Sequence, residues 1–249
     1  MGVLKTAAQI DLMRESGRII AKTLRLVSAE IKPGVTPREL DAMAESLILA
    51  EGGVPSFKGY RGYTAATCIS VNEVVIHGIP DDRKLVEGDI ISLDFGVVKD
   101  GWHGDSAWTY PVGEVSTEAK RLMNVTREAL NQGIAKARHG NTVGDIGHAV
   151  QSYVEKNGYG VVRDFVGHGI GERLHDEPHN IAMYGKPNTG VALKNGMTIC
   201  IEPMVTQGTW KVDILDDGWT VLTRDRKLAA HFEHMIAITP NGPEILTKE

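Results

Sequence analysis

The chain has 249 residues, of which 42% are hydrophobic and 24% charged, and its formal net charge at pH 7 is −5. This length can bury a full hydrophobic core, and the charge gives no basic footprint for nucleic acid or an anionic membrane. Residues 1–20 lack the apolar run of a signal peptide and no window approaches 18 apolar residues, so we expect a cytoplasmic protein without a membrane span. Cys68 and Cys200 lie in apolar runs and are expected to be buried free thiols.

The first half of the chain predicts two helices followed by strands. Apolar residues at helical spacing predict a helix over residues 7–30, which ends at Lys32-Pro33-Gly34. Thr36-Pro37-Arg38-Glu39 supplies an N-cap, a proline at the first helical position and a glutamate at the third, and predicts a second helix that ends at Gly52. Strand-like runs follow at residues 67–71, 90–98 and 106–111.

The second half repeats this order of elements. A helix is expected over residues 118–138, and Thr142 begins another that ends at Gly158; strand-like runs follow at 161–166, 197–202 and 234–239. Two α-α-β-β units predict an α+β fold with a curved antiparallel sheet and outer helices. Since no linker-like stretch divides the chain, we expect one domain over residues 1–249, with pseudo-symmetric halves of about 1–112 and 113–249.

Carboxylates stand at equivalent places in the two halves. In each half a His-Gly-Ile tripeptide comes first. A turn and an apolar strand that ends in an acid follow it. A second acid then stands two residues after another histidine. These segments are Leu85–Asp94, His103-Gly104-Asp105 and His77-Gly78-Ile79 in the first half, and Leu193–Glu202, His231-Phe232-Glu233 and His168-Gly169-Ile170 in the second. Any one acid could lie in a solvated loop or a salt bridge, but the mirrored set favours one shared site.

The shared site is predicted to bind metal. Four carboxylates packed together would repel one another unless cations neutralised them. Glycines on both sides of His168 would let the backbone approach a ligand closely. Four oxygen ligands and one imidazole suit two divalent first-row ions such as Mn(II), Fe(II) or Co(II), whereas a structural zinc site would be rich in thiolates.

Five motifs in chain order carry a family resemblance. They are His77-Gly-Ile-Pro, Asp94 with Asp105 eleven residues later, Gly167-His168-Gly-Ile-Gly-x-x-x-His175, Ile201-Glu202-Pro203 and Phe232-Glu233. Together they resemble type I methionine aminopeptidase of the bacterial short form, in peptidase family M24, over essentially the whole chain. The resemblance implies the pita-bread fold and two divalent ions per chain, with Co, Mn and Fe(II) as first candidates and Zn and Ni as further ones. It implies the ligands Asp94, Asp105, His168, Glu202 and Glu233, of which Asp105 and Glu233 would bridge the ions.

The resemblance also suggests which residues act on the substrate. A two-metal site lowers the pKa of a water, and Glu202 would take its proton and pass it to the leaving amine. His175 would donate a hydrogen bond to the carbonyl oxygen as it becomes an oxyanion, and His77 would position the leaving nitrogen. The alternative for His77 is a purely structural histidine.

A methionine pocket is expected beside this site. Tyr60, Tyr63, Cys68 and Trp219 are similar in position to the pocket residues of the family, and Phe57 is a further candidate, although ordinary core aromatics are the alternative. Two departures concern this region. Gly96 stands where many members carry a hydroxyl residue, and Leu174 stands where some have an aromatic.

The expected activity is hydrolytic removal of methionine from deformylated nascent chains whose second residue is small. The chain itself begins Met1-Gly2 and should be its own substrate. Nascent N-termini are the expected partners, with the ribosome as a further candidate, and a monomer is expected. One alternative is an X-Pro peptidase of the same fold, although such enzymes generally carry an extra N-terminal domain and here the first predicted strand begins at residue 67. The other is a non-catalytic module that binds peptides or the ribosome, but such relatives lose ligands and all five are present.

Overall fold

The computed structural model describes residues 4–248, so the predicted Met1-Gly2 cleavage site lies outside the described residues. All four predicted helices are present, and their ends lie within two residues of the predicted ones. They are α1 (Ala7–Ser28), α2 (Pro37–Ala50), α3 (Thr117–Lys136) and α4 (Val143–Lys156).

The second helix of each half begins with the same device. Thr36 and Glu39 form a capping box at the start of α2 and Pro37 is its first residue, as the sequence predicts. Thr142 and Asp145 form the equivalent box at α4. Each box satisfies backbone N–H groups that the first helical turn leaves unpaired, which explains why the local sequence located these helices so closely.

The strands are more numerous than predicted, and most of the additional ones are short. They are β1 (Val54–Pro55), β2 (Cys68–Val71), β3 (Val74–Ile76), β4 (Ile90–Lys99), β5 (Trp102–Pro111), β6 (Gly160–Val161), β7 (Gly167–Gly169), β8 (Asp176–Ile181), β9 (Thr198–Ile201), β10 (Met204–Thr206), β11 (Val212–Ile214), β12 (Val221–Thr223), β13 (Ala229–His231), β14 (His234–Thr239) and β15 (Gly242–Ile245), and a short 3-10 turn, η1, spans Tyr60–Gly62.

Two strand predictions need correction. The run at 161–166 is wrong beyond Val161, because β6 pairs with β10 for only two residues and the chain then leaves the sheet. The strand predicted at 106–111 begins at Trp102, because β4 and β5 form a hairpin whose register runs to the pair Lys99↔Trp102. Asp100 and Gly101 between them both have positive φ (51° and 82°), as a tight two-residue hairpin turn requires.

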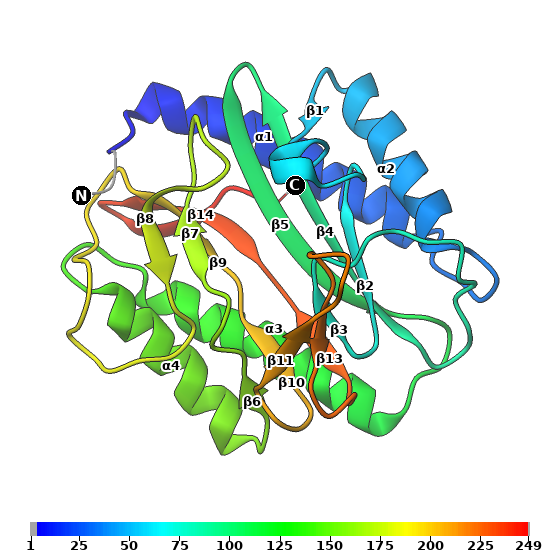
Figure 1. Ribbon diagram of the computed structural model, residues 1–249. Helices are drawn as coiled ribbons and strands as arrows, with labels where there is room; N and C mark the ends of the chain where they lie inside the picture. Colours follow the sequence, from blue (N-terminus) through cyan, green and yellow to red (C-terminus); the bar gives the residue numbers. More distant parts are fainter. Residues whose placement is uncertain (1–3, 249) are drawn as a thin grey trace.

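The strands pair antiparallel in four hydrogen-bonded groups. The first half supplies β1-β4-β2 with β5 beside β4, and the second supplies β15-β14-β9-β7-β8 and β13-β10-β6. The fourth group, β11-β12-β3, joins the halves because β12 pairs with β3. Figure 1 shows α1 and α2 on one outer side of the strands and α3 and α4 on the other, which agrees with the predicted α+β layout.

Each half has its own hydrophobic cluster. One lies between α1, α2 and the strands of the first half, and the other lies between α3, α4 and those of the second. The half-buried Trp108 packs against both clusters, and the backbone N–H of Glu233 donates to the carbonyl of Ala107. The halves are therefore in direct contact at β5. That residues 1–249 form one domain stays a prediction.

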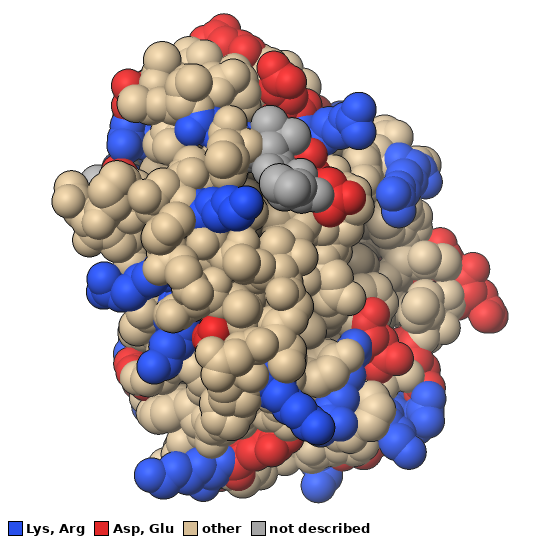
Figure 2. Space-filling view, turned by 90° about the vertical axis from the view of Figure 1, so that its left-hand side faces the viewer, with Lys and Arg blue, Asp and Glu red and all other residues tan. Residues whose placement is uncertain are grey.

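No helix within residues 4–248 is both long and apolar enough to cross a bilayer. On the face drawn in Figure 2, basic and acidic side chains are interspersed around uncharged surface.

Candidate active site

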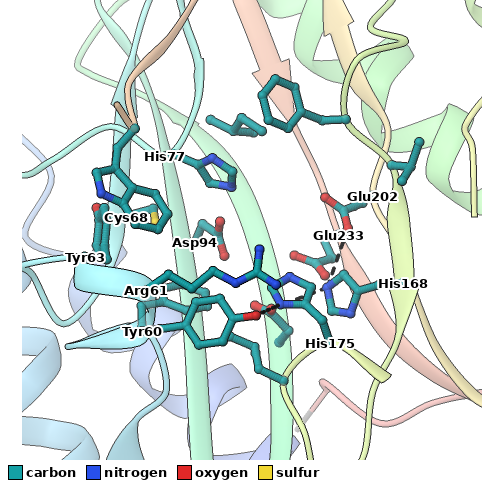
Figure 3. Close-up of a pocket in the computed structure, with 17 residues that line it drawn as sticks. Tyr60, Arg61, Tyr63, Cys68, His77, Asp94, His168, His175, Glu202 and Glu233 are labelled. Carbon is teal, nitrogen blue, oxygen red and sulfur yellow. Dashed lines mark hydrogen bonds and ion pairs between the residues drawn. The ribbon is translucent and has the colours of Figure 1, made fainter. Parts of the chain in front are cut away.

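The five predicted ligands meet at one cavity of about 310 Å³. Asp94 lies on β4, Asp105 on β5 and His168 on β7, while Glu202 follows β9 and Glu233 lies between β13 and β14. Figure 3 shows the side chains of Asp94, His168, Glu202 and Glu233 converging from the two halves. All five residues line the cavity, and each of the two halves contributes two carboxylates.

Strand register explains the convergence. Gly96 lies opposite Asp105 in the β4–β5 ladder, so Asp94, two residues away, projects from the same face as Asp105. In the second half His234 lies opposite Ile201, and the next pair along this antiparallel register is Glu233 and Glu202. Antiparallel pairing thus brings two acids close together in each half, as diagonal neighbours in the first half, where Asp94 itself pairs with Ala107, and as directly opposed residues in the second.

The acids are buried in a way that disfavours their charged forms. Burial raises the pKa of Asp94 to about 6. Burial, and then repulsion from Glu233, Asp94 and Glu202, raises the pKa of Asp105 well above its ordinary value. Burial and neighbouring acids likewise raise the pKa values of Glu202 and Glu233. A cation would reverse this balance, because a nearby positive charge favours carboxylates.

Unpaired oxygens within the cluster fit a metal centre. Asp94 Oδ1, Asp105 Oδ1 and Glu233 Oε1 are buried and have no hydrogen-bond partner among the described residues. One ligand atom from each of these three residues lies within 4.8 Å of the others. Buried polar atoms are normally paired, so oxygens left bare at this spacing suit divalent ions.

His168 is set up as a neutral ligand. Its Nδ1 donates to the carbonyl oxygen of Gly169 at 2.9 Å, which leaves the lone pair on Nε2. That Nε2 lies 3.7 Å from Glu202 Oε1 and 3.9 Å from Asp105 Oδ2. Burial lowers the pKa of His168 to about 3, so the ring is uncharged at neutral pH. In a metal-binding histidine, the ring nitrogen that does not bind the metal usually carries the N–H and donates it to a carbonyl or carboxylate.

Two further residues, for which no role at the site was predicted, also lie at the cluster. His231 is buried, and its Nε2 lies 3.7 Å from Glu202 Oε2 without a hydrogen-bond partner among the described residues. Cys200 is a buried free thiol, as predicted, and groups with His168 and Glu233. The repeated histidine before each second acid was the available signal for His231.

The two histidines expected to act on substrate stand on the cavity wall. Tyr60 Oη is hydrogen-bonded to His175 Nδ1 at 2.7 Å, and the ring centroids of His175 and His168 are 4.3 Å apart. His77 packs edge-on against Phe165 and Trp219. Burial lowers the pKa of each histidine to about 4, so both are neutral and each keeps one N–H to donate.

The predicted methionine pocket forms the apolar wall. Phe57, Tyr60, Tyr63, Cys68 and Trp219 all line the cavity. The Tyr63 hydroxyl is in reach of the carbonyl oxygens of Thr67 and Gly78, and its ring meets that of Trp219 edge-on at 5.0 Å. These residues belong to a hydrophobic cluster as well as to the cavity wall, so the core and pocket interpretations describe the same side chains.

The two departures from the family pattern have structural consequences. A Cβ on residue 96 would lie 2.5 Å from the Phe57 ring, closer than such contacts occur. Phe57 therefore fills the space that a side chain at position 96 would need, and its ring would have to move to admit one. Leu174 is buried and lines the cavity, so a leucine forms this part of the wall where some family members have an aromatic residue.

Four residues on the wall were not predicted from the sequence: Ile76, Val166, Arg61 and Phe165. The last two lie outside the regular strands. Phe165 falls in the segment wrongly predicted as strand. Arg61 lies in η1 with a positive φ of 49°. Neither had a local signal, because the path of the chain between elements decides which of these side chains reach the cavity.

Comparison with known proteins identifies the family. The family model described as "Metallopeptidase family M24" matches residues 11–240. The chain is 50% identical over 248 residues to methionine aminopeptidase 1 of Bacillus subtilis, and the match covers 100% of both. The chain belongs to metallopeptidase family M24. Among solved structures, methionine aminopeptidase from Rickettsia prowazekii has a TM-score of 0.98 at 43% identity, with 99% of this chain and 100% of that chain covered.

This membership confirms the predicted pita-bread fold and a metal-dependent hydrolase of the methionine aminopeptidase group. The prolidase from Pyrococcus furiosus shares the fold alone, with a TM-score of 0.80 at 24% identity, and 66% of its length is covered. Full-length similarity therefore favours the methionine aminopeptidases over the X-Pro alternative.

Proposed function

We propose that this chain hydrolyses the N-terminal methionine from nascent proteins whose second residue is small. The observation that carries this proposal is the meeting of four carboxylates, two of them fully and two partly buried, and one neutral imidazole with an aromatic and sulfur-lined wall in a single cavity. Full-length identity to methionine aminopeptidases supports the same substrate class.

Asp94, Asp105, His168, Glu202 and Glu233 would hold two divalent ions. Such ions supply Lewis acidity and lower the pKa of water when bound. Mn(II), Fe(II) and Co(II) match this oxygen-rich donor set, and Zn(II) and Ni(II) are further candidates.

The protein's own groups would then handle protons and orientation. Glu202 lines the cavity, with its two carboxylate oxygens 3.7 Å from His168 Nε2 and 3.7 Å from His231 Nε2, and it could accept a proton and return it to the leaving amine. A neutral His175, oriented by Tyr60, could donate to the carbonyl oxygen of the substrate. A neutral His77 could contact the leaving nitrogen from the opposite wall, where it packs beside Trp219.

Substrate choice would follow from the shape of the cavity. The unbranched thioether of methionine packs well against Phe57, Tyr63, Cys68 and Trp219. The second residue would then lie near the acids between His77 and His175, where bulk would displace the carbonyl from attack geometry. By this rule the chain should remove its own Met1, because Gly2 is small.

Peptide hydrolysis by the metal-stripped chain tests the proposal. We expect Met release from a Met-Ala peptide after oxygen-free reconstitution with Fe(II), Mn(II), Co(II) or Zn(II), and little from Met-Leu or from X-Pro peptides. An X-Pro preference would identify the alternative peptidase. Failure with every ion, together with no bound metal, would favour a non-catalytic binding module.

The setting of this activity is also a proposal. A cytoplasmic monomer acting on chains that leave the ribosome fits the negative net charge and the absence of a membrane-crossing helix within residues 4–248. Light scattering of the purified protein and co-sedimentation with ribosomes would check these two points.

A further inference from the structure

Arg61 occupies an unusual backbone position beside the cavity. It is the central residue of η1 and has φ 49° and ψ 28°, a left-handed conformation that long side chains rarely adopt. Gly59 and Gly62 beside it also have positive φ, so this turn is built tightly around Arg61. Strained residues of this kind are concentrated at functional sites, where the surrounding structure holds them in place.

The guanidinium of Arg61 has no acidic partner among the residues that the structure describes. Two other exposed arginines, for comparison, do form ion pairs: Arg38 Nε lies 2.8 Å from Asp82 Oδ1, and Arg224 Nε lies 3.0 Å from Asp213 Oδ1. Among residues 4–248, no ion pair or hydrogen bond involves Arg61. Its guanidinium lies over the ring of Tyr60 in a cation–π arrangement, with Cζ 5.3 Å from the ring centroid. A charge held in this way remains available to bind an anion from outside.

The side chain lies over the cavity. Arg61 lines the cavity although the residue as a whole is exposed, which places it at the mouth. Figure 3 shows its side chain extending from η1 toward His175. Its positive charge also contributes to the low pKa of His175, after burial, so the two groups are close.

A peptide bound for cleavage must leave the cavity past this guanidinium. The inference rests on the proposed function, in which methionine occupies the apolar wall and the scissile bond lies near the acids. The residues after the scissile bond then extend to the mouth. Carboxylates are the groups that a guanidinium binds best, through paired hydrogen bonds and charge.

We propose that Arg61 is a specificity-determining residue that binds a substrate carboxylate downstream of the scissile bond, at the third or fourth residue of the nascent chain. The carboxylate could come from an Asp or Glu side chain or, in short peptides, from the free C-terminus. Peptides with an amidated C-terminus separate these sources, because only the side-chain carboxylate then remains.

The experiment compares amidated peptides that differ only in charge. Met-Ala-Asp-Ala and Met-Ala-Ala-Asp are paired with their Asn counterparts, and kcat/KM is measured at low salt and at 0.5 M salt. We expect the wild type to prefer Asp at one of these positions by roughly 2- to 5-fold at low salt, the range of an exposed ion pair, and less at high salt.

Variants then assign the preference to Arg61. Arg61→Asn, which tolerates the left-handed backbone, should bring the Asp/Asn ratio to about one, and Arg61→Lys should keep part of it. Lys58→Gln is the matched control, because it removes one positive charge three residues away whose partner is Glu45, and it should keep the wild-type ratio.

An Asp/Asn ratio near one in the wild type at both positions would overturn the inference. So would a preference that persists in Arg61→Asn or disappears equally in Lys58→Gln. A preference for free over amidated peptides, without one for Asp, would limit the role to the C-terminal carboxylate and contradict recognition of nascent chains. Release of Met from none of the peptides would instead refute the proposed function, and this inference with it.

Discussion

The same tripeptide, His-Gly-Ile, has different surroundings in the two halves of the molecule. His168 in the second half lies on β7, is 6% exposed, and directs Nε2 at the acids. His77 in the first half follows β3 with a positive φ of 58° and packs against Phe165 and Trp219 on the cavity wall. The repeated fold therefore places one imidazole at the carboxylate cluster and the other on the aromatic wall of the cavity.

The carboxylates, in contrast, remain equivalent. Each half brings two acids close together across antiparallel strands. Burial raises the pKa of Asp94, and burial followed by repulsion from neighbouring acids raises the pKa values of Asp105, Glu202 and Glu233. We infer that charge density at the cluster is shared by the two halves, whereas the histidines have separate tasks. Substitutions that affect one task and not the other can test this division.

Glu202→Gln should have the largest effect. It removes a proposed ligand charge and the proposed proton carrier together, and we expect kcat to fall by about 10³-fold or more. Single-turnover kinetics with a Met-Ala peptide would measure the loss. A general base typically contributes about 10²- to 10⁴-fold to the rate. Retention of more than about a tenth of the wild-type kcat would therefore show that the base is another residue.

His175→Ala should lower kcat by about 10²- to 10³-fold while metal content stays unchanged, because its proposed hydrogen bond forms in the transition state. Metal analysis and kinetics on the same preparation provide the comparison. Tyr60→Phe, which removes only the partner of His175, should show a smaller loss of the same kind. A His175→Ala protein that purified without metal would make His175 a ligand instead.

His168→Ala and His77→Ala should separate the two histidine roles. We expect His168→Ala to weaken metal binding by on the order of 10²-fold, as loss of a ligand or its support does. His77→Ala should bind metal normally and lose about 10-fold or more in kcat/KM, through loss of substrate positioning. Calorimetric titration with Mn(II) measures the first effect, and equal metal affinity in both variants would contradict the division of roles.

Gly96→Ala tests the packing of Gly96 against Phe57, two residues that both belong to the first half. The added methyl group would meet the Phe57 ring, and we expect a loss of about 1–3 kcal/mol in the free energy of unfolding, typical of overpacking. Urea unfolding measures it. Phe57→Leu in the same chain should recover part of the loss, and additive effects of the two changes would show that the residues are not coupled.

Local signals explain which parts of the fold were predictable. The helices carry capping boxes and apolar periodicity, so their ends came within two residues. The long strands β4 and β14 were also predicted closely. Strands of two or three residues, such as β6 and β10 to β13, depend on partners far away in the sequence and have no recognisable pattern of their own.

The site divides in the same way. The proposed ligands were found because two copies of one pattern fall at equivalent places, and strand alternation fixes where their side chains point. Arg61 and Phe165 were missed, since irregular segments bring them to the cavity. The clash that couples Gly96 to Phe57 was also invisible, because it depends on contact between residues 39 positions apart.

The number of ions bound, and its dependence on both halves, tests the central claim most directly. The metal-stripped chain would be titrated with Mn(II) without oxygen and followed by electron paramagnetic resonance. We predict two ions per chain with magnetic coupling between them, and loss of the coupling in both Asp105→Asn, from the first half, and Glu233→Gln, from the second. Two uncoupled ions, or coupling that survives either substitution, would contradict a shared centre built by both halves.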